Sequence, residues 1–448
     1  MSPTTAALPP PVPPERCAQC GTETSLSGIF QRQRRSFSRK TRLFCPPCLA
    51  KQRATGQRKK LWWWLLTTVS GTALVLLQPE FPLRWFFLNL AWFDVCLIAS
   101  IAPHELAHAL AARAVGLRVF RVLIGSGQTW WRGRVFGFRT EAKVFPFDGA
   151  VLAAPRAAAG YRWRRFLFIL AGPAANAGLL VLAVAAVPRG VPWANAIGTR
   201  WAGWEFFALA NALILLLNLW PRTVTTALGP SPSDGRNLWR AVFGKTESAA
   251  EAHALWFLLE AVECRESAAR PAALAWLEKG LAAHPENCAL IQIKSILLIE
   301  MGNLAAARPI VLALLARADT PPATRAMFLN NLAYVDALLG GEELLAEADR
   351  ASAEALAAFP WFANTQGTRG TFLLAAGRLD EALAILRAIQ SPPDEDYSSS
   401  AQRTCILALA EAAAGNITEA VRLRAVAHCH DPLCFLLPRV DAALRTPP

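Results

Sequence analysis

The feature that most constrains the fold is Phe166–Val187, a run of 22 residues without a charge. As a helix rising 1.5 Å per residue, this run is long enough to cross the roughly 30 Å hydrocarbon core of a bilayer. Leu61–Gln78 is also uncharged, and Trp85–Ala102 and Trp201–Trp220 contain one acid each. The four stretches predict a mainly α-helical polytopic membrane bundle with about four transmembrane helices. The alternative is a set of buried helices in a soluble protein, which seldom stay uncharged for so long.

The charge distribution predicts how these helices are oriented. Residues 1–250 contain 30 Lys/Arg against 10 Asp/Glu, whereas residues 251–448 contain 16 against 23. The segments before the first stretch and between the second and third are strongly basic, and the other two connections are short. By the positive-inside rule, the protein is predicted to cross the cell membrane several times with both termini in the cytoplasm.

The basic segment between the second and third stretches has a different periodicity. From Leu117 to Leu152, apolar and polar residues alternate between glycines and arginines. This period of two predicts short β-strands with glycine turns at the membrane surface.

The last 190 or so residues are rich in Ala, Leu and Glu and have a helical period. Glycines recur at Gly302, Gly340, Gly377 and Gly415, at steps of 38, 37 and 38 residues. The spacing predicts an array of helix–turn–helix units similar to tetratricopeptide repeats. A generic helical bundle is the alternative.

Two Cys-x-x-Cys pairs lie near the N-terminus. Cys17, Cys20, Cys45 and Cys48 have the spacing of two knuckles that close a tetrahedral zinc site, with no ligand position left for catalysis. The pattern predicts a structural zinc ribbon, and free or redox-active thiols are the alternative. Because the basic residues of this segment adjoin a membrane helix, we expect lipid or protein contacts there and no nucleic acid.

His104-Glu105-Leu106-Ala107-His108 follows directly from the second apolar stretch. On a helix, His104 and His108 lie one turn apart on one face, where both imidazoles can bind one Zn²⁺. Glu105 is then placed to take a proton from a zinc-bound water. Ionisable groups at a membrane helix cost about 2.5–3.5 kcal/mol each on insertion scales, which favours a functional role.

A catalytic zinc needs a third protein ligand. Asp94 lies ten residues before His104, about 15 Å along the same helix, and cannot share the ion. Asp234, in a Pro/Gly-rich segment after the fourth stretch, and Asp148 in the β-patterned segment remain as candidates. Asp234 is also placed where a helix N-cap is expected.

Together these motifs resemble the site-2 protease family of intramembrane zinc metalloproteases. The similarity covers about residues 85–240 and includes the His-Glu-x-x-His, Ala-Gly-Pro-x-x-Asn ending at Asn176, and Asn-x-x-Pro followed by Asp-Gly. It implies that His104, His108 and Asp234 bind zinc, that Glu105 is the general base and that Asn176 lies near the scissile bond. It also implies that Pro146 and Gly149, in the β-patterned segment, contact an unwound substrate. The family's aspartate usually follows the Asn-x-x-Pro closely, whereas 16 positions separate Asn218 from Asp234, and a helix–helix hydrogen bond is the alternative role of Asn176.

The sequence therefore predicts an intramembrane zinc metalloprotease with one catalytic and one structural Zn²⁺. Its expected parts are a disordered segment 1–15, a ribbon 16–60, a membrane core 61–245 and helical repeats 250–446. Its expected partners are the bilayer, membrane-protein substrates and a protein held by the repeats. Two alternatives remain, a catalytically retired membrane scaffold and a soluble-type zinc protease that its apolar helices only anchor.

Overall fold

A computed structural model of the chain describes residues 15–26, 29–34, 41–81, 83–188, 198–226, 229–244, 248–390 and 396–445. The predicted disordered segment 1–15 therefore lies outside the described residues, except for Glu15. The chain divides into two compact units. One comprises Arg53–Leu259, and the other comprises the described residues up to Gln52 together with those from Glu260 onward.

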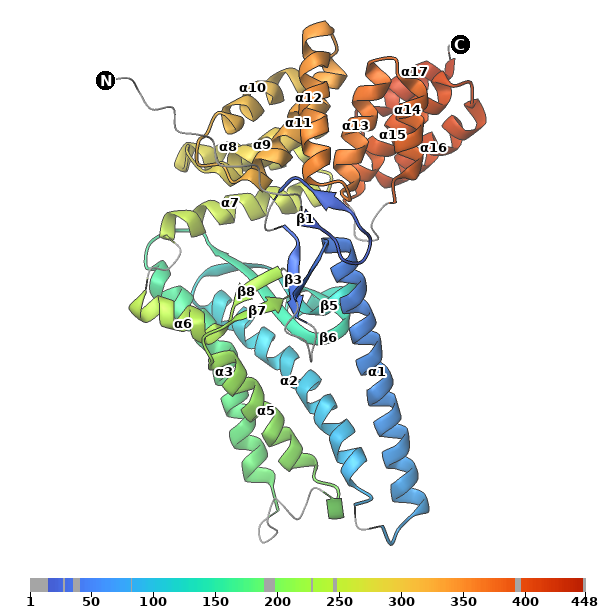
Figure 1. The fold of residues 1–448 in the computed structure, drawn as a ribbon. Helices are drawn as coiled ribbons and strands as arrows, with labels where there is room; N and C mark the ends of the chain where they lie inside the picture. The colour runs from blue at the N-terminus through green and yellow to red at the C-terminus, as the bar shows by residue number, and fades with distance from the viewer. Residues whose placement is uncertain are drawn as a thin grey trace, which may run out of the picture. The chain divides into compact units, whose positions relative to one another are not determined.

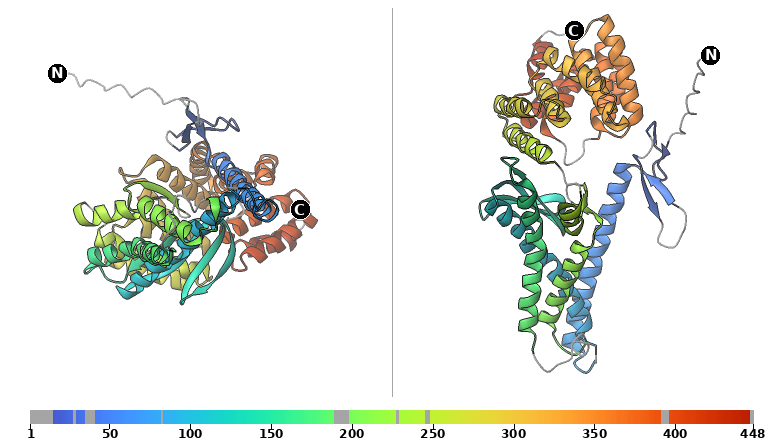
Figure 2. Two further views of the ribbon diagram at one scale, coloured as in Figure 1. Left: turned by 90° about the horizontal axis from the view of Figure 1, so that it is seen from below. Right: turned by 90° about the vertical axis from the view of Figure 1, so that its left-hand side faces the viewer.

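The first unit contains most of the long apolar helices. These are the part of α1 (Pro46–Leu77) from Arg53 onward, α2 (Phe86–Ala114), α3 (Tyr161–Ala186) and α5 (Gly203–Leu219), followed by the short α6 (Asp234–Phe243). Helices α2, α3 and α5 run side by side and pack against one another (Figures 1 and 2). Small residues permit this close packing, including Ala91 on α2 and Ala210 on α5, both fully buried.

Two of these helices, α2 and α3, are long and apolar enough to cross a membrane, whereas the apolar parts Leu61–Leu77 and Gly203–Leu219 are shorter. Large apolar side chains such as Leu77, Val181 and Leu216 are about two-thirds or more exposed. A patch of this kind is covered by lipid or by another protein. These observations support a membrane location, and the number of four spans stays a prediction.

The β-patterned segment forms one antiparallel hairpin, β5 (Leu117–Val135) with β6 (Phe138–Pro155). The expectation of strands was correct, but the expectation of short strands was wrong, because β5 has 19 residues and β6 has 18. Gly125 and Gly127, at φ of +92° and +85°, lie where the register shifts. These glycines bend the strand as bulges do, and they do not end it.

The segment after α5 contains a hairpin that was not expected from the sequence. It follows Arg222 and pairs β7 (Thr223–Thr226) with β8 (Gly229–Pro232) before α6 begins. Helix α7 (Ala249–Glu266) begins where the helical repeats were expected to start, but most of it belongs to the first unit. Its residues Leu255 and Leu259 pack against Phe120 of β5, so the first unit extends to Leu259.

The second unit contains the cysteine segment and the helical array. The cysteine segment forms two small antiparallel pairs that lead into α1, namely β1 (Glu15–Arg16) with β2 (Glu23–Thr24) and β3 (Gln31–Arg34) with β4 (Thr41–Phe44). The array continues from α7 with the following helices: α8 (Arg270–Ala283), α9 (Cys288–Glu300), α10 (Leu304–Leu315), α11 (Pro322–Leu339), α12 (Glu342–Ala358), α13 (Ala363–Ala375), α14 (Leu379–Ala388), α15 (Tyr397–Ala413), α16 (Ile417–His430) and α17 (Leu437–Arg445).

The recurring glycines explain the regular spacing of this array. Each of Gly302, Gly340, Gly377 and Gly415 has φ between +74° and +81° and lies between the two helices of one hairpin. A positive φ ends a helix with little strain only at glycine. Four successive hairpins therefore match the predicted tetratricopeptide-like pattern. Apolar residues of the last three hairpins form one core, and the first hairpin packs against α11 in smaller clusters.

Candidate active site and metal centres

The two histidines of α2 and Asp234 of α6 meet inside the first unit. Nε2 of His104 lies 3.1 Å from Nε2 of His108 and 3.1 Å from Oδ2 of Asp234, and Nε2 of His108 lies 3.5 Å from the same oxygen. Zinc bonds of about 2.0–2.2 Å in tetrahedral geometry place neighbouring ligand atoms roughly 3.3–3.6 Å apart. The three atoms thus have close to the spacing that one zinc ion requires.

Gly172 of α3 gives this cluster its space. A Cβ atom at position 172 would overlap both Nε2 atoms of the histidine pair, so any larger residue would displace the imidazoles. The glycine of the Ala-Gly-Pro motif therefore has a packing role beside the histidines.

Each imidazole is held from behind by an acceptor on its other nitrogen. Nδ1 of His104 lies 2.5 Å from Oδ1 of Asn176, and Nδ1 of His108 lies 2.7 Å from the backbone oxygen of Phe168. If each Nδ1–H donates to its partner, each Nε2 lone pair faces the cluster, as metal ligation requires. Of the two roles considered for Asn176, its contacts correspond to the helix–helix hydrogen bond, because this fully buried amide also donates to Oδ1 of Asn211 on α5 at 2.9 Å.

The long spacing between Asn218 and Asp234 is closed by the β7–β8 hairpin. At its base, the backbone N–H of Ser233 donates to the oxygen of Arg222 at 2.8 Å, and the Ser233 hydroxyl donates to the oxygen of Trp220 at 2.7 Å. A Cβ at Gly235 would collide with the Leu219 carbonyl, so glycine permits this approach. The hairpin therefore returns the chain to the end of α5, where α6 begins at Asp234.

Ser233, not Asp234, caps α6. The Ser233 hydroxyl accepts from the backbone N–H of Arg236, which leaves the Asp234 carboxylate free to face the histidines. Burial opposes ionisation of Asp234, but His104 and His108 outweigh it in their doubly protonated form, in which each Nε2–H donates to the carboxylate, and they hold the pKa of this carboxyl well below its usual range. An ionised carboxylate is the form that binds a metal.

Glu105 lies beside the cluster in a cavity of about 840 Å³. The cavity is lined by residues of α2, β6, α3, α5, β8 and α6. Glu105 is 7% exposed, and a Cβ at Gly149 of β6 would overlap its side chain. Gly149 thus contacts the predicted base as well as lining the cavity. Pro146 lies in β6, but its side chain is outside the described part of the structure.

Asp148, the other candidate ligand, lines the same cavity but is not among the three ligand atoms that come together. Its Oδ1 is buried without a hydrogen-bond partner, and burial raises the pKa of its carboxyl. Of the two aspartates that the sequence left open, only Asp234 therefore completes a cluster with the histidines.

The site also contains polar residues that the sequence analysis did not assign a role. Asn211 orients Asn176, and Nδ2 of Asn218 lies 3.4 Å from Nε2 of His104, where it lines the cavity. Both are asparagines in an otherwise apolar helix, a pattern that marks polar contacts in membrane bundles. The Phe168 acceptor is a backbone group and has no sequence signal.

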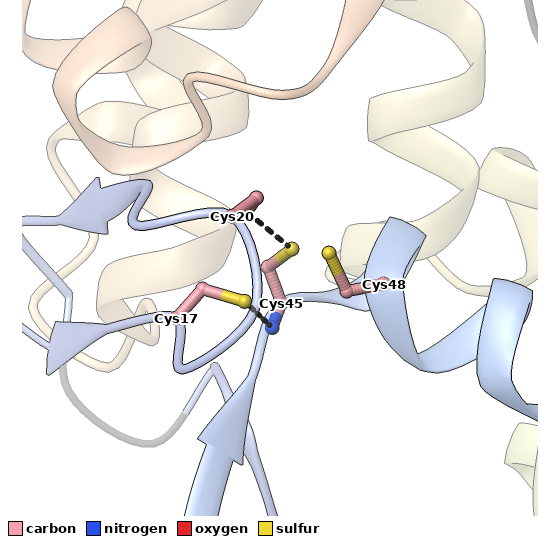
Figure 3. A group of neighbouring side chains, drawn as sticks. All are labelled: Cys17, Cys20, Cys45 and Cys48. Atoms are coloured by element: carbon pink, nitrogen blue, oxygen red, sulfur yellow. Dashed lines mark hydrogen bonds between the residues drawn. The ribbon is translucent and has the colours of Figure 1, made fainter.

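The four predicted cysteines form a second cluster, in the second unit. Their sulfur atoms lie within 4.8 Å of one another, and the side chains converge from the β1–β2 turn and from the junction of β4 and α1 (Figure 3). The backbone N–H of Cys45 donates to Sγ of Cys17 at 3.4 Å. Although burial opposes ionisation, backbone N–H groups donating to this sulfur lower the pKa of Cys17 to about 6. Four converging cysteine sulfurs at this spacing fit a tetrahedral zinc ion with all four positions filled.

The cysteine segment contacts the helical array directly. The Thr24 hydroxyl donates to the Ala358 oxygen at 2.7 Å, and the backbone N–H of Ser25 donates to the Ala357 oxygen at 3.1 Å. The rings of Phe30 and Trp361 lie 5.3 Å apart, and Phe30 packs with Cys17 and Cys45. The ribbon and the array, expected as separate parts, form one packed body.

Comparison with known proteins finds a protein family whose sequences match the segment that contains this site. Residues 92–261 match Peptidase family M50. Over 127 residues, or 24% of this chain, the sequence is 28% identical to the zinc metalloprotease Rip1 of Mycolicibacterium smegmatis, and the match spans 31% of that protein. The similarity to site-2 proteases is thus confirmed over this segment, and it supports a zinc metallopeptidase in the membrane.

Two solved structures that are similar to part of the chain are repeat proteins. A thermophilic tetratricopeptide-repeat protein of Thermus thermophilus is 21% identical with a TM-score of 0.34, covering 43% of this chain and all of that protein. YrrB, a tetratricopeptide-repeat protein described as having an unusual peptide-binding site, is 17% identical with a TM-score of 0.26, covering 42% of this chain and 92% of that protein.

Proposed function

We propose that this chain is an intramembrane zinc metalloprotease that hydrolyses peptide bonds in or near the transmembrane helices of membrane proteins. The observation that carries the proposal is the cluster of His104, His108 and Asp234 at zinc-ligand spacing, with Glu105 beside it in one cavity. Three protein ligands and an adjoining cavity leave a fourth position for water, as catalytic zinc sites require.

The chain's own residues have distinct roles in this proposal. Glu105 accepts the proton of the attacking water and passes it to the leaving amine. The Asn218 amide donates to the oxygen that gains charge, and Asn176 fixes the ring of His104. A bound zinc ion would lower the pKa of its water and polarise the scissile carbonyl.

The substrate must expose its peptide bond before this chemistry can occur, because helical hydrogen bonds shield it. We propose that a substrate helix unwinds beside β6, where Asp148, Gly149 and Ala150 line the cavity. An extended segment presents its carbonyl without an internal hydrogen bond, and the absence of a Cβ at Gly149 leaves room for the Glu105 side chain next to it. Pro146 belongs to the same proposed contact.

The membrane arrangement is part of the proposal. The protein would cross the cell membrane several times, with its N- and C-termini and the mouth of the cavity in the cytoplasm. The Cys17, Cys20, Cys45 and Cys48 cluster would hold a second, structural zinc. Because all four positions there are filled by protein, this ion would have no part in hydrolysis.

A second function, peptide binding by the repeats, is favoured by a cavity of about 260 Å³ lined by the first helices of successive hairpins. In it, Oδ1 of Asn330 and the hydroxyl of Tyr334 are buried without a hydrogen-bond partner. Amides such as Asn331 and Asn364 surround them, and amides can both donate to and accept from a peptide backbone. A peptide library selected on the full chain should yield ligands whose affinity falls at least about tenfold in Asn330→Leu, matching a lost buried hydrogen bond.

The test of the protease is cleavage of a model membrane-helix substrate by the full chain in lipid vesicles. We expect Glu105→Gln to lose more than about a thousandfold in rate with its zinc content unchanged, because glutamine cannot accept the proton. Glu80→Gln, a change of the same kind at an exposed residue between α1 and α2, is the matched control and should cleave normally.

Three outcomes would contradict the proposal. Unimpaired cleavage by Glu105→Gln would remove the base from the mechanism, and the absence of cleavage by the wild-type chain would favour the scaffold. Faster cleavage of an unfolded soluble polypeptide than of the membrane helix would favour a soluble-type zinc protease that its apolar helices only anchor.

A further inference from the structure

Helix α6, which begins at the ligand Asp234, presents an unpartnered apolar face. Trp239, Val242 and Phe243 are 61%, 46% and 72% exposed. At about 100° per residue these three side chains occupy an arc of roughly 100°, and Arg236 and Arg240 continue the same side. A helix with aromatic residues flanked by arginines has the composition of one that lies in a membrane interface.

The place of α6 in the fold identifies what covers this face. Arg162, at the start of α3, donates from Nε to the Ala241 oxygen at 2.6 Å and from its guanidinium to the Val242 oxygen at 2.7 Å. These bonds fix the end of α6 beside the N-terminal end of α3, where Figure 1 shows the short helix. The face of α6 is therefore continuous with one end of the apolar bundle.

That end of the bundle has the composition of a membrane boundary. Trp163 near the start of α3 is 71% exposed, and Trp220, just after the end of α5, is 67% exposed. Exposed tryptophans beside arginines mark the level where lipid headgroups meet acyl chains. Trp239 of α6 is a third exposed tryptophan attached to the same end.

We propose that α6 lies in the cytoplasmic bilayer interface, with Trp239, Val242 and Phe243 among the acyl chains and its arginines at anionic headgroups, and that this contact holds Asp234 against the histidines. The second part rests on the proposed zinc site. Asp234 is the first residue of α6, and the hairpin before it is closed at its base by Ser233. The lipid contact, the Arg162 bonds and the Ser233 bonds then fix the two ends of the helix, and Trp239, Val242 and Phe243 act as positioning residues.

The first experiment tests the lipid contact without reference to zinc. The full chain, with benzoylphenylalanine in place of Trp239, is reconstituted in vesicles of phosphatidylethanolamine and phosphatidylglycerol and irradiated. We expect lipid adducts on the peptide that contains position 239. Replacement of Tyr397, an exposed aromatic of the repeats, serves as the control and should give none. Adducts from position 239 to protein only, whether this chain, a second copy or another partner, would overturn the proposal.

The second experiment tests the coupling to Asp234 through zinc affinity, measured by chelator competition in the same vesicles. We expect Trp239→Ser with Phe243→Ser to weaken zinc binding at the histidine cluster about tenfold and to leave the cysteine cluster unchanged. The single variant Trp239→Tyr should keep the zinc affinity of the wild-type chain, because tyrosine also favours the membrane interface. Tyr397→Ser is the matched control.

The outcomes separate this inference from the proposed function. Lipid adducts with unchanged zinc affinity in the double variant would overturn the coupling. Zinc binding by the wild-type chain without any lipid adduct would overturn the interfacial placement of α6 while leaving the protease proposal intact. A wild-type chain that forms adducts but binds no zinc through His104 would overturn the protease proposal and the coupling, and retain only the lipid contact.

Discussion

The two candidate metal centres of this chain are built in opposite ways. The four cysteines come from one short segment, and Cys17 and Cys45 are 28 positions apart. His104 and Asp234 are 130 positions apart and meet only because four helices, α2, α3, α5 and α6, fold together with two hairpins. A centre encoded by local spacing can close around its ion on its own, whereas a centre assembled by the fold can combine ligands with a base and a cavity.

The surroundings of the two centres also differ, because one cluster is closed and the other adjoins a cavity. The cysteine cluster packs against Phe30 and Trp361, and all four of its ligand positions are filled by protein. The histidine cluster adjoins a cavity of about 840 Å³ that also contains Glu105. In the proposed function, hydrolysis belongs to the histidine centre and stabilisation to the cysteine centre. The predictions below test this division, in decreasing order of the expected effect on cleavage.

The largest effect is expected from Asp234→Ala. Loss of a ligand should weaken zinc binding at the histidine cluster by more than about a hundredfold, beyond the range for an orienting partner, and abolish cleavage. Asp148→Ala, the matched control in the same cavity, should retain zinc. Metal analysis after dialysis against a weak chelator measures the zinc content of both variants. Zinc loss in Asp148→Ala alone would mean that Asp148 of β6, and not Asp234, is the third ligand.

A smaller effect is expected from Asn176→Ala. This change removes the acceptor that orients His104, so we expect zinc affinity or cleavage to fall about 10- to 100-fold. Asn176→Asp, which keeps the acceptor, should retain more activity than the alanine variant. Equal losses in both variants would show that the Asn176 donor bond to Asn211, and not the acceptor, is what matters.

Removal of half of the cysteine cluster should hardly change cleavage. Cys17→Ser with Cys20→Ser should lose one of two zinc ions per chain, and cleavage should stay within about twofold, because a closed site contributes folding energy locally. Elemental analysis and the vesicle assay measure both quantities. Loss of all zinc would show that the cysteine segment supports the membrane unit.

The smallest effect concerns the contact between ribbon and repeats. Thr24→Val removes the hydroxyl that donates to Ala358 and should weaken the docking of the ribbon by about 1 kcal/mol. Hydrogen exchange around residue 24 should then be about fivefold faster, at unchanged cleavage. Unchanged exchange would mean that Phe30 and Trp361 hold the ribbon without this bond.

Local patterns made much of this fold predictable. The periodic glycines predicted the helical hairpins because a positive φ is required at one position of every hairpin, and the alternation from Leu117 predicted strands. The predicted strands are too short because Gly125 and Gly127 do not form the expected glycine turns and are bends within one strand. The sequence contains no separate signal that distinguishes the two roles.

The site was predictable where its residues share one helix. His104, Glu105 and His108 follow from the spacing of a single turn, whereas the choice between Asp148 and Asp234 depends on tertiary structure. The β7–β8 hairpin accommodates the extra residues before Asp234 and is closed by backbone hydrogen bonds at its base. No pattern of side chains in the sequence predicts these bonds. The Phe168 acceptor was missed for the same reason.

The most direct test of two opposite centres is zinc K-edge X-ray absorption of the full chain in lipid, with and without a hydroxamate that binds open zinc sites. We predict sulfur at about 2.3 Å and nitrogen or oxygen at about 2.0–2.2 Å, with about two of each per zinc on average. The hydroxamate should change the nitrogen and oxygen shell and leave the sulfur shell unchanged. A sulfur shell that responds to the hydroxamate, or a spectrum without sulfur, would contradict the division into one closed and one open centre.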